Sequence, residues 1–320
     1  MTTLHGALRR STAALLSLAL AASATTAADL KIENLKKEKA SEKPLTADEI
    51  KAAKPMPSKE VSPEELQQMR ERFRALNPGL LNLKADPGKQ GSLVKGVPEK
   101  VADPSAAAPY WSTGRLVFRD DDGDLSTCTA QFVEDAAVIL TAAHCVMNEK
   151  NGEWFSDFVF DRAYNDGQKA QTVGWRCVSL FDAFHDPDPN YAYDYAFILA
   201  DKTDDQAPLD LATGTPATSA LTAIGYPDNF GGSEFLYKVD GEWAEVLDGI
   251  VTMKGNPMRS GNSGGAWFTD FKVGGGSGEN RVISLNSHHI EGNTEDENGP
   301  LFTADTNRLL QHVATARCLD

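Results

Sequence analysis

One serine in this chain lies in a sequence suited to nucleophilic catalysis. It is Ser263, in the run Ser260-Gly261-Asn262-Ser263-Gly264-Gly265. A serine hydroxyl attacks well only when a base removes its proton, and the negative charge that develops needs hydrogen-bond donors. Glycines on both sides of the Asn-Ser pair let the backbone bend so that amide N–H groups point at one spot. We therefore expect the N–H groups of Gly261 and Ser263 to form an oxyanion hole, although the run taken alone also fits an ordinary Gly/Ser turn.

The candidate base is His144, in the run Leu140-Thr141-Ala142-Ala143-His144-Cys145. An apolar strand leads directly into this histidine, and small residues flank it, so the imidazole should lie at the end of a strand. A lone histidine in this setting fits a structural role as well. The 119 residues between His144 and Ser263 leave room for one β-barrel.

The third candidate is Asp194, which opens the apolar run Tyr195-Ala196-Phe197-Ile198-Leu199. A buried carboxylate is costly unless it accepts hydrogen bonds. The imidazole N–H of His144 is a suitable donor, and the carboxylate would fix its tautomer and stabilise the imidazolium formed during turnover. Asp186, Asp188 and Asp201 compete for this role, but they lie in polar or Pro-containing stretches.

The elements that must position these residues are short β-rich runs separated by turns rich in Gly and Asp. This pattern begins near residue 109 and is typical of all-β barrels or sandwiches. Only the end of the chain, residues 303–316, has the apolar spacing of a helix. The expected strands span residues 114–119, 127–133, 137–141, 155–160, 172–181, 195–199, 220–225, 235–239, 249–254, 265–268 and 281–285.

The first 28 residues have the pattern of a secretory signal peptide. Arg9 and Arg10 precede an apolar stretch, residues 13–22, and small residues follow it. Ala22-Ser23-Ala24 and Thr26-Ala27-Ala28 are two possible cleavage sites. The apolar stretch is too short to cross a bilayer comfortably, and a buried N-terminal helix is the alternative. We expect a secreted or periplasmic protein without a membrane anchor.

Residues 29–105 differ in composition from the rest, being rich in Lys, Glu, Pro and Ala. A helix is expected from Pro63 to about Leu76, with Ser62 as its N-cap. The remainder is too polar to form a core, so we expect a mostly irregular segment. Such a segment is a candidate propeptide, with a linker or tail as the alternative. Residues 106–320 then form the catalytic domain.

The net charge also limits the partners. The chain has 31 Lys and Arg against 46 Asp and Glu, a net charge of −15, and the acidic excess falls after residue 105. Such a domain is repelled by nucleic acid and by anionic membranes. We expect a monomer whose partners are proteins or peptides.

Four cysteines are present, namely Cys128, Cys145, Cys177 and Cys318. An even number in an exported chain indicates two disulfides, with three pairings possible. No two of them have the close spacing of a zinc pair, so we expect neither a metal nor a cofactor.

The order His144, Asp194, Ser263, with the motifs around the first and last, resembles the chymotrypsin-like serine peptidases over roughly residues 109–320. Gly225-Tyr226-Pro227, Asn262 before the serine and a C-terminal helix are similar to the bacterial and fungal glutamyl-endopeptidase branch. The resemblance implies two six-stranded antiparallel β-barrels with the site between them. His144 and Asp194 would come from the first barrel and Ser263 from the second.

The resemblance also implies a disulfide between Cys128 and Cys145, beside the catalytic histidine. A loop of this length contributes about 3 kcal/mol in the chain-entropy model. Cys177 and Cys318 would then pair and tie the C-terminal helix to the first barrel.

The residue before the nucleophile differs from that of the digestive peptidases, and this difference concerns activation. Digestive peptidases have an Asp before the nucleophile, which a newly freed N-terminus neutralises, but here Asn262 carries no charge to pair. A zymogen of this protein would instead have its cleft covered by the propeptide or a new N-terminus withheld.

The residues expected in the specificity pocket differ as well from those of trypsin-like and glutamyl enzymes. Trypsin-like pockets hold an Asp where this chain has Pro257, and glutamyl endopeptidases hold a Thr and a His where it has Met258 and Asn286. Neither specificity is therefore supported. We expect three further residues, Ser287, His288 and His289, to line the entrance of the pocket. The two histidines could bind an acidic side chain when protonated, and exposed loop residues are the alternative.

The leading hypothesis is a secreted serine endopeptidase that forms an acyl-enzyme on Ser263. Periplasmic heat-shock proteases share Gly-Asn-Ser-Gly-Gly, but they typically lack a Cys after the catalytic His. They also carry a peptide-binding domain, for which the 57 residues after Ser263 leave no room. A catalytically silent binding or adhesion protein is the non-enzymatic alternative. Such chains usually lose a triad member, and none is missing here.

Overall fold

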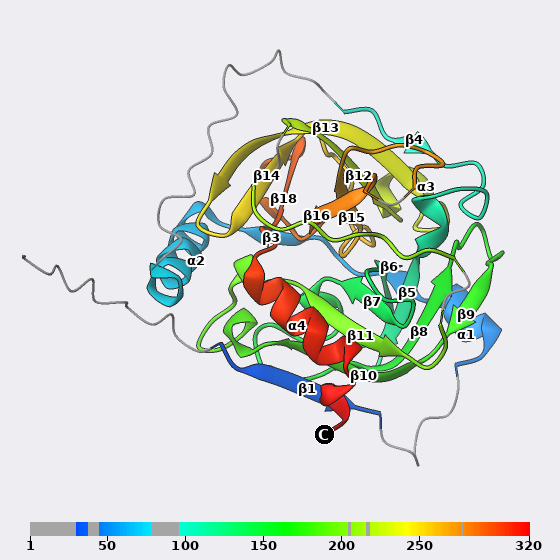
Figure 1. Ribbon diagram of the computed structural model, residues 1–320, viewed down its shortest axis with the longest axis horizontal. Helices are drawn as coiled ribbons and strands as arrows, with labels where there is room; N and C mark the ends of the chain where they lie inside the picture. Colours follow the sequence, from blue (N-terminus) through cyan, green and yellow to red (C-terminus); the bar gives the residue numbers. More distant parts are fainter. Residues whose placement is uncertain (1–29, 38–44, 79–95, 204–205, 216–217, 277) are drawn as a thin grey trace, which may run out of the picture.

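Two curled antiparallel sheets of nine strands each make up the fold, and Figure 1 shows them as the upper and lower halves of the molecule. The computed structural model describes residues 30–37, 45–78, 96–203, 206–215, 218–276 and 278–320. The expected signal peptide lies outside these residues. The sheets confirm the expected all-β class with two barrels.

The first sheet has the strand order β1-β10-β11-β7-β6-β5-β8-β9, and β2 pairs with β6. Aromatic residues fill its interior, where the rings of Phe132 and Phe160 meet edge to face with centroids 5.4 Å apart. Its strands from residues 106–320 are β5 (Thr113–Arg119), β6 (Leu125–Phe132), β7 (Val138–Thr141), β8 (Ser156–Arg162), β9 (Gln171–Val173), β10 (Trp175–Phe181) and β11 (Ala196–Ala200).

The second sheet has the order β16-β15-β12-β13-β14-β18-β17-β3, and β4 pairs with β13. Trp243, Met253 and Trp267 belong to a separate apolar cluster inside it. Its strands from residues 106–320 are β12 (Ala220–Gly225), β13 (Tyr237–Leu247), β14 (Ile250–Lys254), β15 (Ala266–Thr269), β16 (Arg281–Leu285), β17 (His288–Ile290) and β18 (Asp296–Pro300).

Most strand expectations are confirmed within two residues, and the exceptions have physical reasons. The expected strand 235–239 extends as β13 to Leu247, because β14 pairs with its second half. The expected strand 172–181 divides into β9 and β10, which pair with different neighbours. Strand β18 was not expected, because Asp-Glu-Asn-Gly-Pro is a turn-forming composition. It is a strand here because β14 pairs along its whole length.

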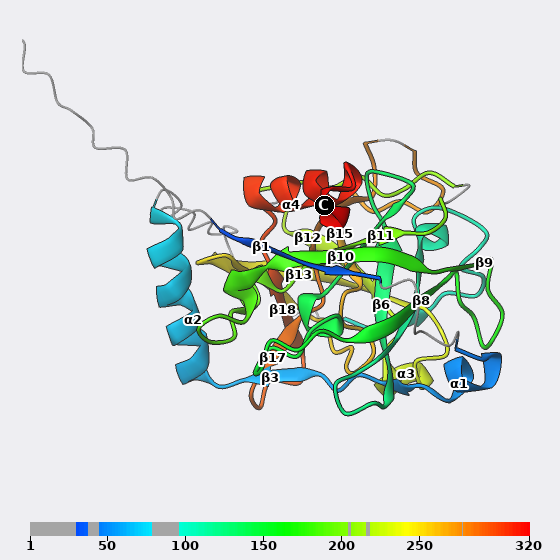
Figure 2. The ribbon, with the colours of Figure 1, turned by 90° about the horizontal axis from the view of Figure 1, so that it is seen from below.

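The N-terminal segment, residues 30–105, contributes four short strands to the two sheets. They are β1 (Ile32–Lys36), β2 (Lys54–Pro55), β3 (Lys59–Val61) and β4 (Glu99–Lys100). Strands β1 and β4 pair antiparallel with β10 and β13, whereas β2 and β3 pair in parallel with β6 and β17. Figure 2 shows the run from helix α1 (Ala47–Ala52) through β3 to α2 (Pro63–Leu76) along one side of the molecule.

Helix α2 confirms the expected helix. Ser62 is its N-cap and forms a capping box with Glu65. Met69 and Phe73 are buried, and the Phe73 ring lies 5.7 Å from that of Tyr193, in the turn η5 (Tyr191–Tyr193) that precedes β11 of the first sheet. Arg74 donates to Asp248, between β13 and β14 of the second sheet, with its Nε 2.8 Å from the carboxylate. The helix therefore contacts both sheets.

Helix α4 (Ala304–Ala314) confirms the expected C-terminal helix, with Thr303 as its N-cap. Leu309, Leu310 and Val313 are buried against the first sheet. The remaining helical turns are α3 (Asp228–Gly231), η2 (Tyr110–Ser112), η3 (Ala143–Cys145), η4 (Asp182–Phe184), η5 (Tyr191–Tyr193) and η6 (Arg317–Leu319).

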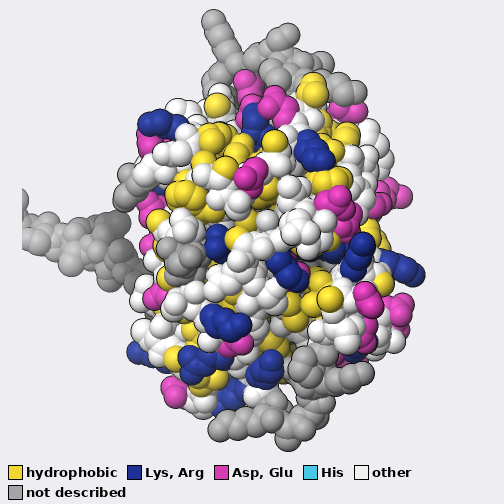
Figure 3. Space-filling view, turned by 90° about the vertical axis from the view of Figure 1, so that its right-hand side faces the viewer, with side chains coloured by type: hydrophobic (Ala, Val, Ile, Leu, Met, Phe, Trp, Pro, Cys, Tyr) yellow, Lys and Arg dark blue, Asp and Glu magenta, His cyan; other side chains and the backbone are white. Residues whose placement is uncertain are grey.

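Charges of both signs are interspersed over the upper part of the face drawn in Figure 3, and several Lys and Arg side chains gather on its lower part. In the described part of the chain, no helix is both long and apolar enough to span a bilayer.

Candidate active site

The loop that carries Ser263 joins β14 to β15, and residues of β6 in the other sheet hold it. The Ser263 carbonyl accepts a hydrogen bond from the Thr129 N–H at 2.8 Å. The Thr129 hydroxyl donates to the Gly261 carbonyl at 2.9 Å, and the Gln131 amide donates to the Gly264 carbonyl at 2.9 Å. Ser263 is therefore fixed at the junction of the two sheets.

Two positions in this loop require glycine. Gly261 and Gly264 have φ values of 75° and 85°, in the left-handed region that glycine favours. A Cβ on Gly264 would lie 2.3 Å from the carbonyl oxygen of Thr129. The glycines of the motif thus allow the close approach of the two backbones.

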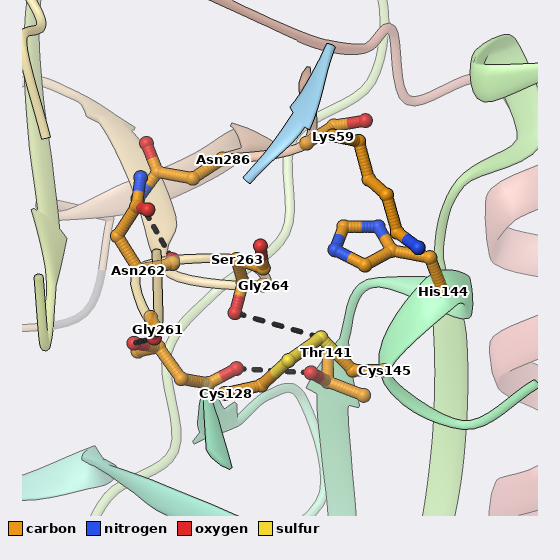
Figure 4. The surroundings of a disulfide bond; sticks show 12 residues. Lys59, Cys128, Thr141, His144, Cys145, Gly261, Asn262, Ser263, Gly264 and Asn286 are labelled. Carbon is orange, nitrogen blue, oxygen red and sulfur yellow. Dashed lines mark hydrogen bonds between the residues drawn. A yellow bond between two sulfur atoms is a disulfide. The ribbon is translucent and has the colours of Figure 1, made fainter. Parts of the chain in front are cut away.

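His144 lies in η3, directly after β7, and is fully buried. The Cys128–Cys145 disulfide connects this turn to β6. Figure 4 shows the disulfide between the Ser263 loop and His144, with the sulfur of Cys145 3.9 Å from the Ser263 carbonyl oxygen. The bond thus joins the supports of the two candidate catalytic residues.

Asp194 follows η5, immediately before β11, and its carboxylate has three hydrogen-bond donors. Oδ1 accepts from the backbone N–H of His144 at 2.9 Å, and Oδ2 lies 2.8 Å from Nδ1 of the same residue. The Ser287 hydroxyl donates to Oδ2 at 2.5 Å. Burial alone would raise the pKa of Asp194, but the His144 ring and these donors outweigh it and lower the pKa. The carboxylate is therefore held ionised.

The competing acids lie elsewhere. The Asp201 carboxylate accepts from the Gly174 N–H at 2.8 Å, and the side chain of Asp188 is 68% exposed beside Arg72. Asp186 is exposed as well. None of the three has a described hydrogen bond to His144.

The structure does not join Ser263 to His144 by a hydrogen bond. Among the described residues, Nε2 of His144 is buried without a hydrogen-bond partner. Nucleophile–base hydrogen bonds are often long without substrate and tighten in the reacting complex. The site therefore has the contact between Nδ1 of His144 and the Asp194 carboxylate, whereas Nε2, the other ring nitrogen, has no described partner.

One of the two candidate oxyanion-hole donors binds a peptide carbonyl of the same chain. The Gly261 N–H donates to the Met56 carbonyl oxygen at 2.9 Å. Residues 54–61 of the N-terminal segment pass over this loop, and Ser263 is only 3% exposed. The Gly261 N–H, beside the candidate nucleophile, thus points to a position where a carbonyl oxygen can bind.

The candidate specificity residues are placed in different ways. Met258 is buried in the core of the second sheet, and Pro257 is partly exposed beside it. The Asn286 amide accepts from Asn256 and Trp267 at 2.9 and 2.6 Å, and it donates to the carbonyls of Ile224 and Asn262. Through these four bonds, the Asn286 side chain connects Asn262 of the serine loop to Asn256, Trp267 and Ile224.

Ser287, His288 and His289 are buried at and beside β17, under β3, which differs from the exposed-loop alternative. The pKa of His289 is raised: burial opposes protonation, but Glu297 outweighs it with a carboxylate oxygen 3.0 Å from Nε2. Its charge is thus already paired. The Ser287 hydroxyl binds Asp194, a contact that no local sequence pattern predicts.

Burial lowers the pKa of His288 to about 3, so this ring is neutral in the folded protein. An unfolded histidine takes up a proton near pH 6.5, so stability must fall as the pH falls from 6.5 toward 3. We expect His288→Phe, which keeps a ring against Tyr191, to lose about 3 kcal/mol less than the wild type between pH 7 and pH 4. Urea unfolding at both pH values measures this difference, and equal losses would contradict it.

Cys128, His144 and Cys145 have potential ligand atoms within 4.8 Å of one another. Both sulfurs are in the disulfide, so they offer no thiolate to a metal. The second disulfide, Cys177–Cys318, joins β10 to η6. Both bonds agree with the pairing that the resemblance implied.

Comparison with known proteins gives matches only at the level of structure, since no family model and no curated protein matches the sequence. The protease Anisep from Arthrobacter nicotinovorans superimposes with a TM-score of 0.57 and 20% identity, covering 69% of this chain and 100% of its own. A Glu endopeptidase gives a TM-score of 0.57 and 19% identity, covering 72% and 100%. This protein has the chymotrypsin-like serine protease fold.

The chymotrypsin-like fold does not by itself establish catalysis. An inactivated protease paralogue of the scabies mite also matches, with a TM-score of 0.50 and 13% identity over 70% of this chain and 98% of its own. Whether this chain is a catalyst therefore depends on the residues of the site. About three tenths of this chain has no counterpart in the whole Anisep chain, so the chymotrypsin-like part is accompanied by additional sequence.

Proposed function

We propose that this protein is an exported serine endopeptidase with Ser263 as nucleophile, His144 as base and Asp194 as its orienting carboxylate. The observation that carries the proposal is the 2.8 Å contact between Nδ1 of His144 and Oδ2 of Asp194. It favours the tautomer in which Nδ1 carries the proton and Nε2 is a free base. Nε2 is the ring nitrogen without a partner in the described structure.

In the proposed reaction, Nε2 of His144 takes the hydroxyl proton as Oγ of Ser263 attacks the substrate carbonyl carbon. The oxygen becomes an oxyanion, stabilised by the N–H groups of Gly261 and Ser263. The imidazolium donates its proton to the leaving amine as the peptide bond breaks, and an acyl-enzyme remains. Water then attacks the ester, His144 accepts the water's proton and returns it to Oγ, and the acid product leaves.

Two features support export, and a third bears on the substrates, which we propose to be proteins or peptides. Two disulfides need an oxidising compartment to persist. The expected signal peptide, residues 1–28, lies at the start of the chain. The excess of acidic residues after residue 105 argues against nucleic acid as a partner. We therefore place the enzyme outside the cell or in the periplasm.

Hydrolysis of unfolded casein tests the proposal against the silent binding protein. We expect Ser263→Ala to lower kcat by on the order of 10⁶-fold, because triad members act as a unit. Ser219→Ala, at a partly exposed serine outside the site, should leave the rate within about twofold. A wild-type protein freed of its N-terminal segment that hydrolyses casein no faster than Ser263→Ala would instead indicate the binding protein.

A further inference from the structure

Residues 54–61 cross the site from one sheet to the other. At one end, Lys54 and Pro55 pair with Ser126 and Thr127 of β6. At the other end, Lys59 to Val61 pair with β17, directly beside Ser287. The segment thus lies along the junction of the two sheets, where Ser263 and His144 also lie.

The middle of the segment uses the atoms that catalysis would need. The Met56 N–H donates to the Thr127 carbonyl at 2.9 Å, and the Met56 carbonyl accepts from the Gly261 N–H at 2.9 Å. Ser58 and Ser260 exchange two hydrogen bonds, with the Ser260 N–H 2.6 Å from the Ser58 hydroxyl. A substrate carbonyl cannot reach the Gly261 donor while Met56 remains there.

Lys59 adds a charged anchor beside the base. Its ammonium lies 2.9 and 3.1 Å from the two carboxylate oxygens of Glu149, whose side chain is only 6% exposed. The Tyr191 hydroxyl, 3.4 Å from Glu149, completes this acidic subsite. Figure 4 draws the Lys59 side chain beside His144. Removing the ammonium would leave a buried carboxylate without its cation, which is strongly unfavourable.

The sequence prepares the segment to bind in an extended form. Pro55 and Pro57 each fix φ, and each disfavours helical conformations in the residue before it. Little freedom is therefore lost when Met56 docks. Helices α1 and α2 fasten the two ends, through Ile50 in a cluster with Val117 and through Phe73 and Arg74. This tethering gives the segment a high effective concentration at the cleft.

We infer that residues 54–61 are an intramolecular inhibitor of the protease, with the Met56 carbonyl on the Gly261 donor of the oxyanion hole and Lys59 in the acidic subsite at Glu149. This inference rests on the proposed function and names its regulation. The full chain is latent, and activation requires the segment to leave the cleft. The site that the segment vacates accepts an extended peptide, with room for a basic side chain at Glu149.

The rate of covalent labelling by a fluorophosphonate tests latency. We expect the intact chain to label at least about 100-fold more slowly than the chain cleaved by a metalloprotease, which the probe does not modify. Lys59→Ala in the intact chain should label at least about tenfold faster than the wild type, and Lys59→Arg should restore slow labelling. Lys51→Ala, at an exposed lysine of α1, is the matched control and should not change the rate. Equal labelling of intact and cleaved chains would overturn the inference.

A second measurement does not depend on activity. In the Ser263→Ala chain, we expect hydrogen exchange of residues 258–264 to be at least about tenfold faster with Lys59→Ala than with Lys51→Ala, because the Gly261 N–H loses its acceptor. Equal exchange would overturn the inference. If no form labels or cleaves casein while exchange does respond to Lys59, the proposed function fails and the segment is still a ligand of the cleft.

Discussion

Asp194→Asn is expected to lower kcat by about 10⁴-fold and to leave KM nearly unchanged. An amide at this position can present its NH₂ group to the Nδ1 side of His144, which favours the tautomer with the proton on Nε2. That nitrogen could then no longer accept the proton of Ser263. The loss should appear in peptide hydrolysis by protein freed of its N-terminal segment.

Asp201→Asn is the matched control for this substitution. Its carboxylate also accepts a backbone N–H, that of Gly174 at 2.8 Å, but it has no described contact with His144. We expect a change within about twofold. Equal losses for Asp194→Asn and Asp201→Asn, or a rate for Asp194→Asn near that of the wild type, would remove Asp194 from the triad.

The two disulfides are expected to differ in what they stabilise. Cys177 and Cys318 are 141 residues apart, and in the chain-entropy model their bond contributes about 5 kcal/mol to the free energy of unfolding. Cys128 and Cys145 are 17 residues apart, and their bond contributes about 3 kcal/mol. Replacing each pair with alanine and measuring urea unfolding should give losses in this order.

Their effects on activity should have the opposite order. The Cys128–Cys145 bond joins the strand that holds the Ser263 loop to the turn that carries His144. We expect its removal to lower kcat in the folded protein by about tenfold or more, since small misplacements of catalytic groups are costly. Removal of Cys177–Cys318, at the C-terminal helix, should leave kcat within about twofold. An activity loss confined to the second pair would contradict this account.

The sequence predicts those parts of the site whose local pattern is unusual. Gly261 and Gly264 mark the serine loop because only glycine fits their backbone conformation and the approach of Thr129. Asp194 stands out because it is an acid at the start of an apolar strand. Helix α2 was also predictable, because Ser62 and Pro63 form a local start signal.

Contacts between distant residues could not be predicted in the same way. Lys59 and Glu149 are 90 residues apart, and Ser287 and Asp194 are 93 apart, so no spacing along the chain joins them. His288 and His289 are buried where β3 pairs with β17, and the polar composition around β3 does not predict a strand. Tertiary pairing decides the conformation of such segments, because their local preferences are weak.

The most direct test of the central claim is mass spectrometry of the folded protein, freed of its N-terminal segment, after reaction with a fluorophosphonate. We expect one covalent adduct, located on Ser263, with no adduct on the Ser263→Ala protein and greatly slowed reaction of His144→Ala. A wild-type protein that remains unlabelled, or that carries its adduct on another residue, would contradict the claim.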